Sequence, residues 1–82
     1  MERGIIIFGT WWCGGCKRTR RFFDMNSIPY KWVDIDNDEK AEAFVISTNH
    51  GYRSVPTIVL ENGLILVEPS DKDLKQLLEK IH

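Results

Sequence analysis

Two cysteines separated by two residues, Cys13 and Cys16, are the side chains best suited to chemistry in this chain of 82 residues. They follow an apolar run at residues 5–8 and open a segment with helical periodicity, which predicts a strand-to-helix turn. Cys13 would begin the helix, beside free backbone N–H groups and the positive dipole end, a setting that favours the nucleophilic thiolate. Cys16, one turn further on, is placed to attack a mixed disulfide formed on Cys13.

Three other uses of the two cysteines fit the sequence less well. A structural disulfide would close too short a loop to restrict the unfolded chain. A zinc site needs more ligands, and only His50 and His82 could join, at spacings that match no common zinc pattern. Inert core thiols are the third alternative, but the two intervening glycines and the basic run that follows argue for access. Redox chemistry is therefore the favoured interpretation, and no metal site is expected.

The length and charge of the chain limit the kinds of function that the protein can have. A chain of 82 residues allows one domain, residues 1–82, with one modest core. The hydrophobic fraction of 43% and the charged fraction of 28% are typical of a soluble globular protein, and a net charge of −1 recruits neither nucleic acid nor a membrane. The run at residues 5–8 is too short for a signal core or a membrane span, so we expect a cytoplasmic protein. In that compartment a CxxC pair is more often catalytic or metal-binding than structural.

The hydrophobic pattern predicts elements in the order β-α-β-α-β-β-α. The expected strands are residues 5–8, 30–36, 57–61 and 64–67. The expected helices are residues 14–26, a segment capped by Asp36 with Glu39 and ended at Gly51, and a segment capped by Ser70 with Asp73. The first βαβ unit should be parallel and right-handed, and Asn62-Gly63 predicts a hairpin that adds an antiparallel pair. The expected fold class is α/β, with a mixed four-stranded sheet and helices on both faces.

Apolar stripes at helical spacing predict the buried faces of the helices. Phe22 and Phe23 are expected to enter the core from the first helix. The expected buried positions of the other two helices are Ala41, Phe44, Val45, Thr48, Leu74, Leu77, Leu78 and Ile81. The last helix should cover the sheet and contribute packing rather than chemistry.

A cluster of basic residues follows the second cysteine. Lys17 and Arg18 are expected close enough to the thiols to influence them electrostatically, whereas Arg20 and Arg21 are expected on a solvated face. Nucleic-acid binding is a poor explanation of the cluster, because no second basic patch supports it. His50 is expected to be a solvated residue at a helix end rather than a ligand.

The CxxC after the first strand, the Val-Pro before the third and the element order together resemble the glutaredoxin branch of the thioredoxin fold. Within that branch the sequence most resembles the mycoredoxins, which work with mycothiol. The resemblance runs from Gly4 to Ile81. The stretches that carry it are Trp12-Cys13, Ala43-Phe44-Val45, Arg53-Ser54-Val55-Pro56-Thr57 and Glu68-Pro69-Ser70.

The resemblance implies a thiol–disulfide oxidoreductase, with Cys13 as the nucleophile and Cys16 as the resolving thiol of a redox-active disulfide. It also implies a cis peptide bond between Val55 and Pro56, because a cis bond costs much less free energy before proline than before any other residue. The Val55 backbone would then face the thiols and pair with a bound substrate as an added strand. The other residues expected to contact substrate are Trp12, Lys17, Arg53, Ser70 and Asp71.

The same resemblance implies no tightly bound cofactor and a low-molecular-weight thiol, mycothiol or glutathione, as co-substrate. The expected substrates are thiolated or disulfide-bonded proteins. The protein is expected to be a monomer, and a small thiol or a flavin reductase would return it to the reduced state. Glutathione-using relatives carry a Gly-Gly pair where this chain has residues 68–71, and relatives often carry proline and an aromatic residue in place of Gly14-Gly15. Two alternatives stay open. One is a redoxin that supplies ribonucleotide reductase, although its signature after the fourth strand is missing; the other is an iron–sulfur glutaredoxin, which the available Cys16 disfavours.

Overall fold

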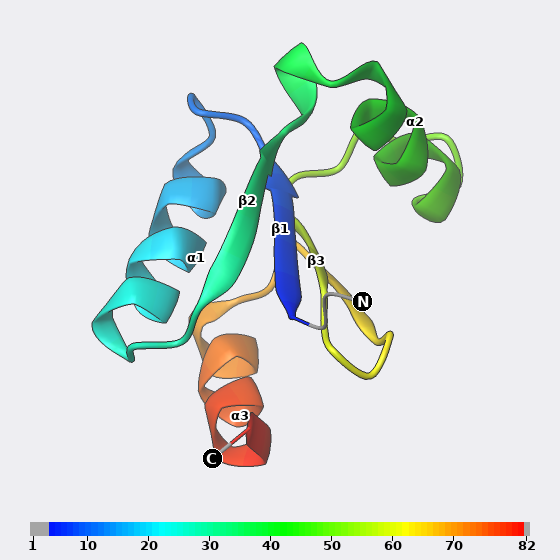
Figure 1. The fold of residues 1–82 in the computed structure, drawn as a ribbon. Helices are drawn as coiled ribbons and strands as arrows, with labels where there is room; N and C mark the ends of the chain where they lie inside the picture. Colours follow the sequence, from blue (N-terminus) through cyan, green and yellow to red (C-terminus); the bar gives the residue numbers. More distant parts are fainter. Residues whose placement is uncertain (1–3, 82) are drawn as a thin grey trace.

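A four-stranded sheet in the order β2-β1-β3-β4 forms the centre of the computed structural model, which describes residues 4–81 (Figure 1). The strands are β1 (Ile5–Gly9), β2 (Tyr30–Asp34), β3 (Thr57–Val59) and β4 (Ile65–Val67). The helices are α1 (Gly14–Met25), α2 (Glu39–Thr48), α3 (Asp71–Ile81) and a short 3-10 turn, η1 (Ile35–Asn37). The predicted order of strands and α-helices is confirmed.

The sheet is mixed, as the sequence predicts. β1 pairs in parallel with β2, from Ile5 opposite Tyr30 to Gly9 opposite Asp34. The other two pairs, β1 with β3 and β3 with β4, are antiparallel. The β-branched run of β1 therefore lies between two neighbours, where strands are most buried.

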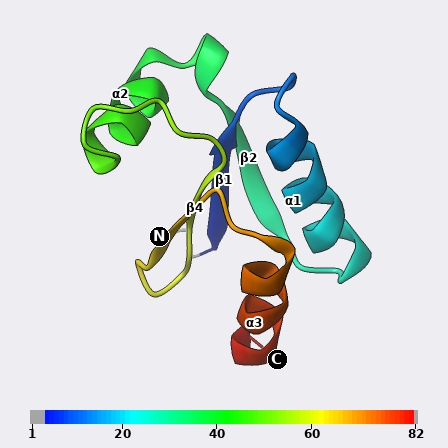
Figure 2. The same ribbon diagram turned by 180° about the vertical axis from the view of Figure 1, so that it is seen from behind.

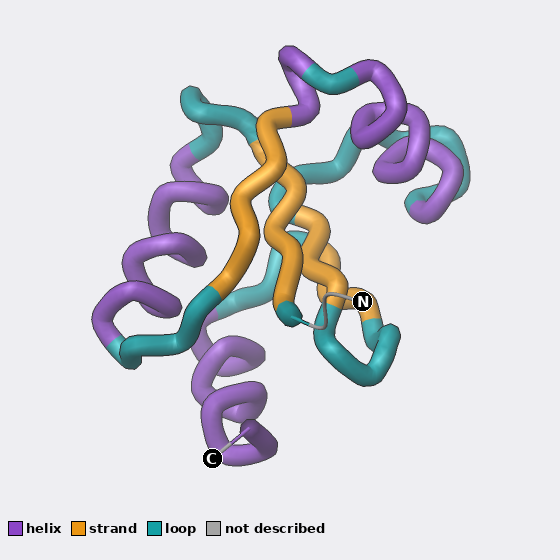
Figure 3. Tube along the Cα trace, in the orientation of Figure 1, coloured by secondary structure: helices purple, strands orange, loops and turns teal. Residues whose placement is uncertain are grey.

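Helices cover both faces of this sheet: α1 and α3 lie on one side and α2 on the other, as Figure 1 and Figure 2 show. The larger core cluster joins the sheet to α1 and α3 and contains Ile5, Ile7, Phe23, Ile28, Ile58, Leu74 and Leu77. The smaller cluster on the α2 side contains Ile35, Ala41 and Val45. The loops from β1 to α1 and from α2 to β3 meet at the carboxyl end of β1, where Phe8 lies opposite Thr57 (Figure 3).

Two local predictions for α2 are wrong. Its N-cap is Asp38, whose Oδ1 accepts a hydrogen bond from the Ala41 N–H at 3.0 Å, and not Asp36. The reason is that β2 stops at Asp34, whose side chain accepts from the Asp36 N–H and starts η1. Phe44, expected in the buried stripe, is 37% exposed, although its ring lies 5.0 Å from that of Phe8.

The turn and capping predictions nearer the C-terminus are confirmed. Gly63 has a φ of 89° and donates its N–H to the Leu60 carbonyl, closing the β3–β4 hairpin at the Asn62-Gly63 pair. Ser70 and Asp73 exchange side-chain-to-backbone hydrogen bonds of 3.0 and 3.1 Å at the start of α3. Along α3, Leu74 and Leu77 are buried and Leu78 is partly buried, while the side chain of Ile81 lies outside those described. Phe22 is likewise half-buried, beside the fully buried Phe23.

Candidate active site

Cys13 is the N-cap residue of α1, at the turn where β1 gives way to the helix. Its Sγ accepts a hydrogen bond from the Cys16 N–H at 3.2 Å, so the sulfur takes the place of the oxygen that a capping Ser or Asp supplies. The Cys13 side chain is half-buried, and both cysteines are free thiols. The predicted strand-to-helix turn is confirmed, and the first thiol is the accessible one of the two.

Cys16 is fully buried behind Cys13. The pKa of the Cys16 thiol is raised to about 12, first by burial and then by the hydrogen bond with Cys13, against the lowering effects of a backbone hydrogen bond from Thr10 and the charge of Arg20. The two thiols therefore have different environments: one faces solvent and one is held protonated in the core at neutral pH.

The Val55–Pro56 peptide bond is cis, as expected, and it lies opposite Cys13. The Cys13 Sγ–H donates to the Val55 carbonyl at 3.8 Å. Residues from three parts of the chain line a small cleft of about 210 Å³ at this point: Cys13, Gly15, Arg18, Val55, Pro56, Glu68 and Pro69. The cleft gives a substrate sulfur an approach to Cys13 between α1 and the loop before β3.

A polar network occupies one side of Cys13. Trp12 is 69% exposed, and its Nε1–H donates to Asp36 at 2.9 Å. Arg53 pairs with Asp36 and, at 2.6 Å, with Glu42. Hydrogen bonds from Arg53 and then from Trp12 lower the pKa of the Asp36 carboxyl. The structure thus joins two residues expected at the site, Trp12 and Arg53, through the Asp36 carboxylate, which the sequence analysis did not assign to it.

The other expected binding residues lie around the second side of the cleft. Arg18, which lines the cleft, pairs with Asp71 at 3.4 Å. Ser70 caps α3 directly after Pro69, which also lines the cleft. Lys17 is exposed and is not among the cleft residues, so the cation that the structure brings to Cys13 on α1 is Arg18.

Arg20 differs from its predicted solvated position. Its guanidinium lies over two indole rings, 4.6 Å from the centroid of Trp11 and 4.5 Å from that of Trp32. The side chain is half-buried, and its Nε has no hydrogen-bond partner among residues 4–81. The cause is long-range: Ile7 lies opposite Trp32 in the sheet, so this ring shares the face of the sheet that α1 covers. Periodicity within one helix does not contain that information.

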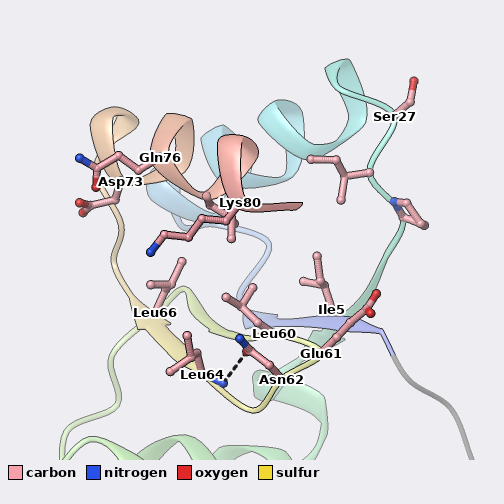
Figure 4. Close-up of a pocket in the computed structure, with 13 residues that line it drawn as sticks. Ile5, Ser27, Leu60, Glu61, Asn62, Leu64, Leu66, Asp73, Gln76 and Lys80 are labelled. Atoms are coloured by element: carbon pink, nitrogen blue, oxygen red, sulfur yellow. Dashed lines mark hydrogen bonds between the residues drawn. The ribbon is translucent and has the colours of Figure 1, made fainter. Parts of the chain in front are cut away.

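A larger cavity, of about 600 Å³, lies between α3, the β3–β4 hairpin and the loop before β2 (Figure 4). Figure 4 shows Ile5, Leu60 and Leu66 along it, with the polar side chains of Asp73 and Lys80 from α3. None of the residues expected to act in chemistry or binding lines this cavity. Within residues 4–81, no helix is long and apolar enough to cross a membrane, and no three His, Cys, Asp or Glu side chains gather as a metal site would require.

Comparisons with known proteins agree with this geometry. The family model described as Glutaredoxin matches residues 5–65. A protein of Mycobacterium tuberculosis, provisionally named a glutaredoxin, is 40% identical over 77 residues, which cover 94% of this chain and 92% of the relative. Mycoredoxin 1 of Corynebacterium glutamicum is 34% identical over 65 residues, covering 79% of this chain and 80% of that protein.

Solved structures show the same fold. A glutaredoxin from Archaeoglobus fulgidus aligns with a TM-score of 0.72 at 21% identity, over 93% of this chain and 86% of that one. A mutant of a thioredoxin-like protein aligns with a TM-score of 0.79 at 23% identity, over 95% and 97%. The fold and the relatives define a thiol–disulfide oxidoreductase of the thioredoxin fold. Within that class, this chain belongs to the glutaredoxin family.

Proposed function

We propose that this protein reduces mixed disulfides between proteins and a small thiol, and also protein disulfides, through a dithiol formed by Cys13 and Cys16. The observation that carries the proposal is the contrast between the two sulfurs: Cys13 opens onto the cleft as the cap of α1, and Cys16 is buried behind it. Helix N-termini favour a thiolate at such a position. Cys13 can therefore attack the substrate disulfide, and Cys16 can then resolve the mixed disulfide formed on Cys13.

The chemistry is two successive exchanges. The Cys13 thiolate attacks the small-thiol sulfur of the mixed disulfide; a new S–S bond forms on Cys13, the old bond breaks, and the target protein leaves as a thiolate that takes up a proton. Cys16 then loses its proton and attacks Cys13 Sγ. This step releases the small thiol and leaves a Cys13–Cys16 disulfide, which an external reductant opens.

The loop before β3 is the proposed docking wall for substrate. The Cys13 thiol donates a hydrogen bond to the Val55 carbonyl, and this bond is lost once Cys13 ionises or enters a disulfide. The Val55 backbone is then free to pair with an extended segment of the substrate. Pro56, Trp12, Arg53, Lys17, Ser70 and Asp71 complete the proposed binding residues.

The charges of the cleft favour a small thiol without net charge. Arg18 is already paired with Asp71, and Glu68 adds a carboxylate to the cleft wall. Glu68 is fixed there with a φ of 48° by its N–H, which donates to the Pro56 carbonyl at 2.9 Å. Glutathione carries a net negative charge and mycothiol carries none, so we assign a mycothiol-type co-substrate, in keeping with the relative named mycoredoxin 1.

The proposal also covers the setting of the reaction. A small thiol or a flavin reductase returns the Cys13–Cys16 disulfide to the dithiol, and no cofactor is held between turnovers. We infer a monomer working in the reducing cytoplasm, where a CxxC pair serves catalysis more often than structure. The residues 1–82 are proposed to form one domain.

The test is to oxidise the protein and compare mycothiol, bacillithiol, glutathione and thioredoxin reductase as reductants. Mycothiol should regenerate the dithiol faster than glutathione. Glu68→Gln should raise the rate with glutathione by roughly two- to fivefold, the size of an exposed charge interaction, and leave the rate with mycothiol unchanged. A wild-type protein that prefers glutathione, or a Glu68→Gln protein with unchanged rates for both, would contradict the assigned thiol.

A further inference from the structure

Among the described residues, Arg20 is the arginine around this site that forms no ion pair. Arg18 pairs with Asp71, and Arg53 pairs with Asp36 and Glu42. The Arg20 guanidinium lies instead against the faces of two tryptophan rings. An aromatic face attracts a cation without cancelling its charge, so the guanidinium keeps a positive field in a half-buried place.

The helical geometry of α1 places the Arg20 charge near Cys16. Arg20 follows Cys16 by four residues, so both side chains lie on the same side of the helix. Trp32, whose ring lies against the guanidinium, is also close to the thiol. A Cβ added at Gly9 would meet Cys16 Sγ at 2.6 Å and the Trp32 ring at 2.7 Å, so the sulfur and the ring converge on one point. The cation, the ring and the buried thiol therefore form one cluster.

The resolving step is the one that needs help from a charge. Cys16 must act as a thiolate, yet burial and the neighbouring Cys13 together raise its pKa to about 12. Arg20 is the charged side chain that lowers this pKa. The other titratable groups beside Arg20 are Asp24 on α1 and Tyr30 on β2; burial and then Asp24 raise the pKa of Tyr30, which stays neutral.

We propose that Arg20, held by Trp11 and Trp32, is a positioning residue for the resolving step, stabilising the Cys16 thiolate as it attacks the mixed disulfide on Cys13. The inference rests on the proposed dithiol function. In the step, the Cys16–Cys13 S–S bond forms, the bond from Cys13 to the small thiol breaks, and the proton from Cys16 passes through solvent to the leaving thiolate. The cysteine pair is oxidised and the small thiol is reduced.

The experiment follows the reduced protein after rapid mixing with equimolar dithiobis(nitrobenzoate), a disulfide that releases a coloured thiolate. The first phase is the attack of Cys13 on the reagent, and its rate depends on reagent concentration. The second phase is the attack of Cys16 on Cys13, which releases a second coloured thiolate at a concentration-independent rate. Cys16→Ser, which lacks the second phase, confirms the assignment of the two phases.

Arg20→Gln should slow the second phase and leave the first unchanged. Each unit of rise in the Cys16 pKa cuts the thiolate fraction tenfold but raises its nucleophilicity about threefold, so the net loss is about threefold per unit. The pH–rate curve of the second phase should shift to higher pH. Arg20→Lys, which keeps the charge, should restore most of the rate, and Arg21→Gln, at an exposed neighbour, should change neither phase.

Two results would overturn the role of Arg20. One is an Arg20→Gln protein whose second phase keeps its wild-type rate and pH dependence. The other is an Arg20→Lys protein as slow as Arg20→Gln, which would assign the effect to stacking rather than charge. If the Gln variant does not fold, Arg20→Met, whose unbranched side chain can pack on the rings, replaces it. A wild-type protein with no second phase would instead overturn the dithiol function itself, and this inference with it.

Discussion

Cys13 and Cys16 are the same residue type with opposite surroundings, and that contrast makes their reactivity predictable. Cys13 faces a cleft and caps a helix, whereas Cys16 is fully buried with a pKa raised to about 12. Only the thiolate is nucleophilic, and an alkylating reagent must also reach the sulfur. At neutral pH, Cys13 is therefore within reach of the reagent, whereas Cys16 is both buried and protonated.

We expect iodoacetamide to modify Cys13 much faster than Cys16 at neutral pH. The measurement is the alkylation rate against pH for the two single variants, Cys13→Ser and Cys16→Ser, each of which leaves one thiol to observe. Unfolding both variants in urea supplies the control, because the two thiols should then react alike. Faster modification of Cys16 in the folded protein would reverse the assigned roles.

The division of work also predicts which substrates survive the loss of one sulfur. Cys16→Ser should still reduce a protein carrying a small-thiol mixed disulfide, because a second molecule of the small thiol can open the intermediate on Cys13. The variant should lose activity on an intramolecular protein disulfide, since that intermediate must be expelled by Cys16. Both activities are measured with the same reductant, and an equal loss on the two substrate types would contradict the proposal.

At the scale of elements, β1 and α1 meet at a point with no room for an added carbon. Gly9→Ala places a Cβ 2.6 Å from Cys16 Sγ and 2.7 Å from the Trp32 ring, so the core must shift. Overpacking of this kind costs about 1–3 kcal/mol. Urea denaturation of the reduced protein should show that loss in the free energy of unfolding.

Gly14 is the matched control for this substitution. A Cβ at Gly14 would have no heavy atom within 4 Å, and the residue lies at the first position of α1. Gly14→Ala should therefore leave the stability unchanged or raise it by up to about 1 kcal/mol, through helix propensity. Equal stabilities of the two variants would show that the packing at Gly9 is looser than described.

The elements themselves were predictable where the signal is local. The type and order of the elements, the Asn62-Gly63 turn and the Ser70–Asp73 cap depend on neighbours within a few residues, and these predictions were confirmed. The cap of α2 was missed because the acidic stretch of residues 34–38 offers several carboxylates at cap-like spacing. Only the end of β2 decides which of them caps the helix.

The candidate site was less predictable than the fold, because its residues are far apart in the sequence. The CxxC spacing and the Val-Pro pair were visible in the sequence. The network from Trp12 through Asp36 to Arg53 joins residues 24 and 17 positions apart. The place of Arg20 likewise depends on a ring from β2. Such contacts exist only after the sheet has formed, and a single sequence carries no local pattern for them.

At the scale of the whole molecule, the buried thiol couples stability to pH. The pKa of Cys16 is raised from 9.0 to about 12 in the folded protein, so the folded state holds a proton that the unfolded state releases. The contribution of the Cys16 proton to the free energy of unfolding is fully present below about pH 9 and is lost as the pH rises towards 12. The reduced protein should lose about 1.4 kcal/mol of unfolding free energy per pH unit in that window.

Equilibrium urea denaturation at several pH values measures this slope. The Cys16→Ala variant is the control, because it removes the titrating group while tyrosine and lysine residues still ionise. The wild-type slope should exceed that of the variant by the stated amount. Parallel pH dependence in the two proteins would show that Cys16 ionises as easily in the folded state as in the unfolded one.

The clustering of aromatic rings makes the molecule its own optical probe. All three tryptophans of the chain lie near the thiols: Trp12 precedes Cys13, and Trp11 and Trp32 stand 5.0 Å apart around Arg20. Tryptophan fluorescence therefore comes from one part of the molecule, and its intensity can follow the redox reaction without an added dye. An unfolding curve recorded by that emission describes the surroundings of the thiols. Unfolding confined to α3, which contains no tryptophan, would not change the emission and needs a separate label.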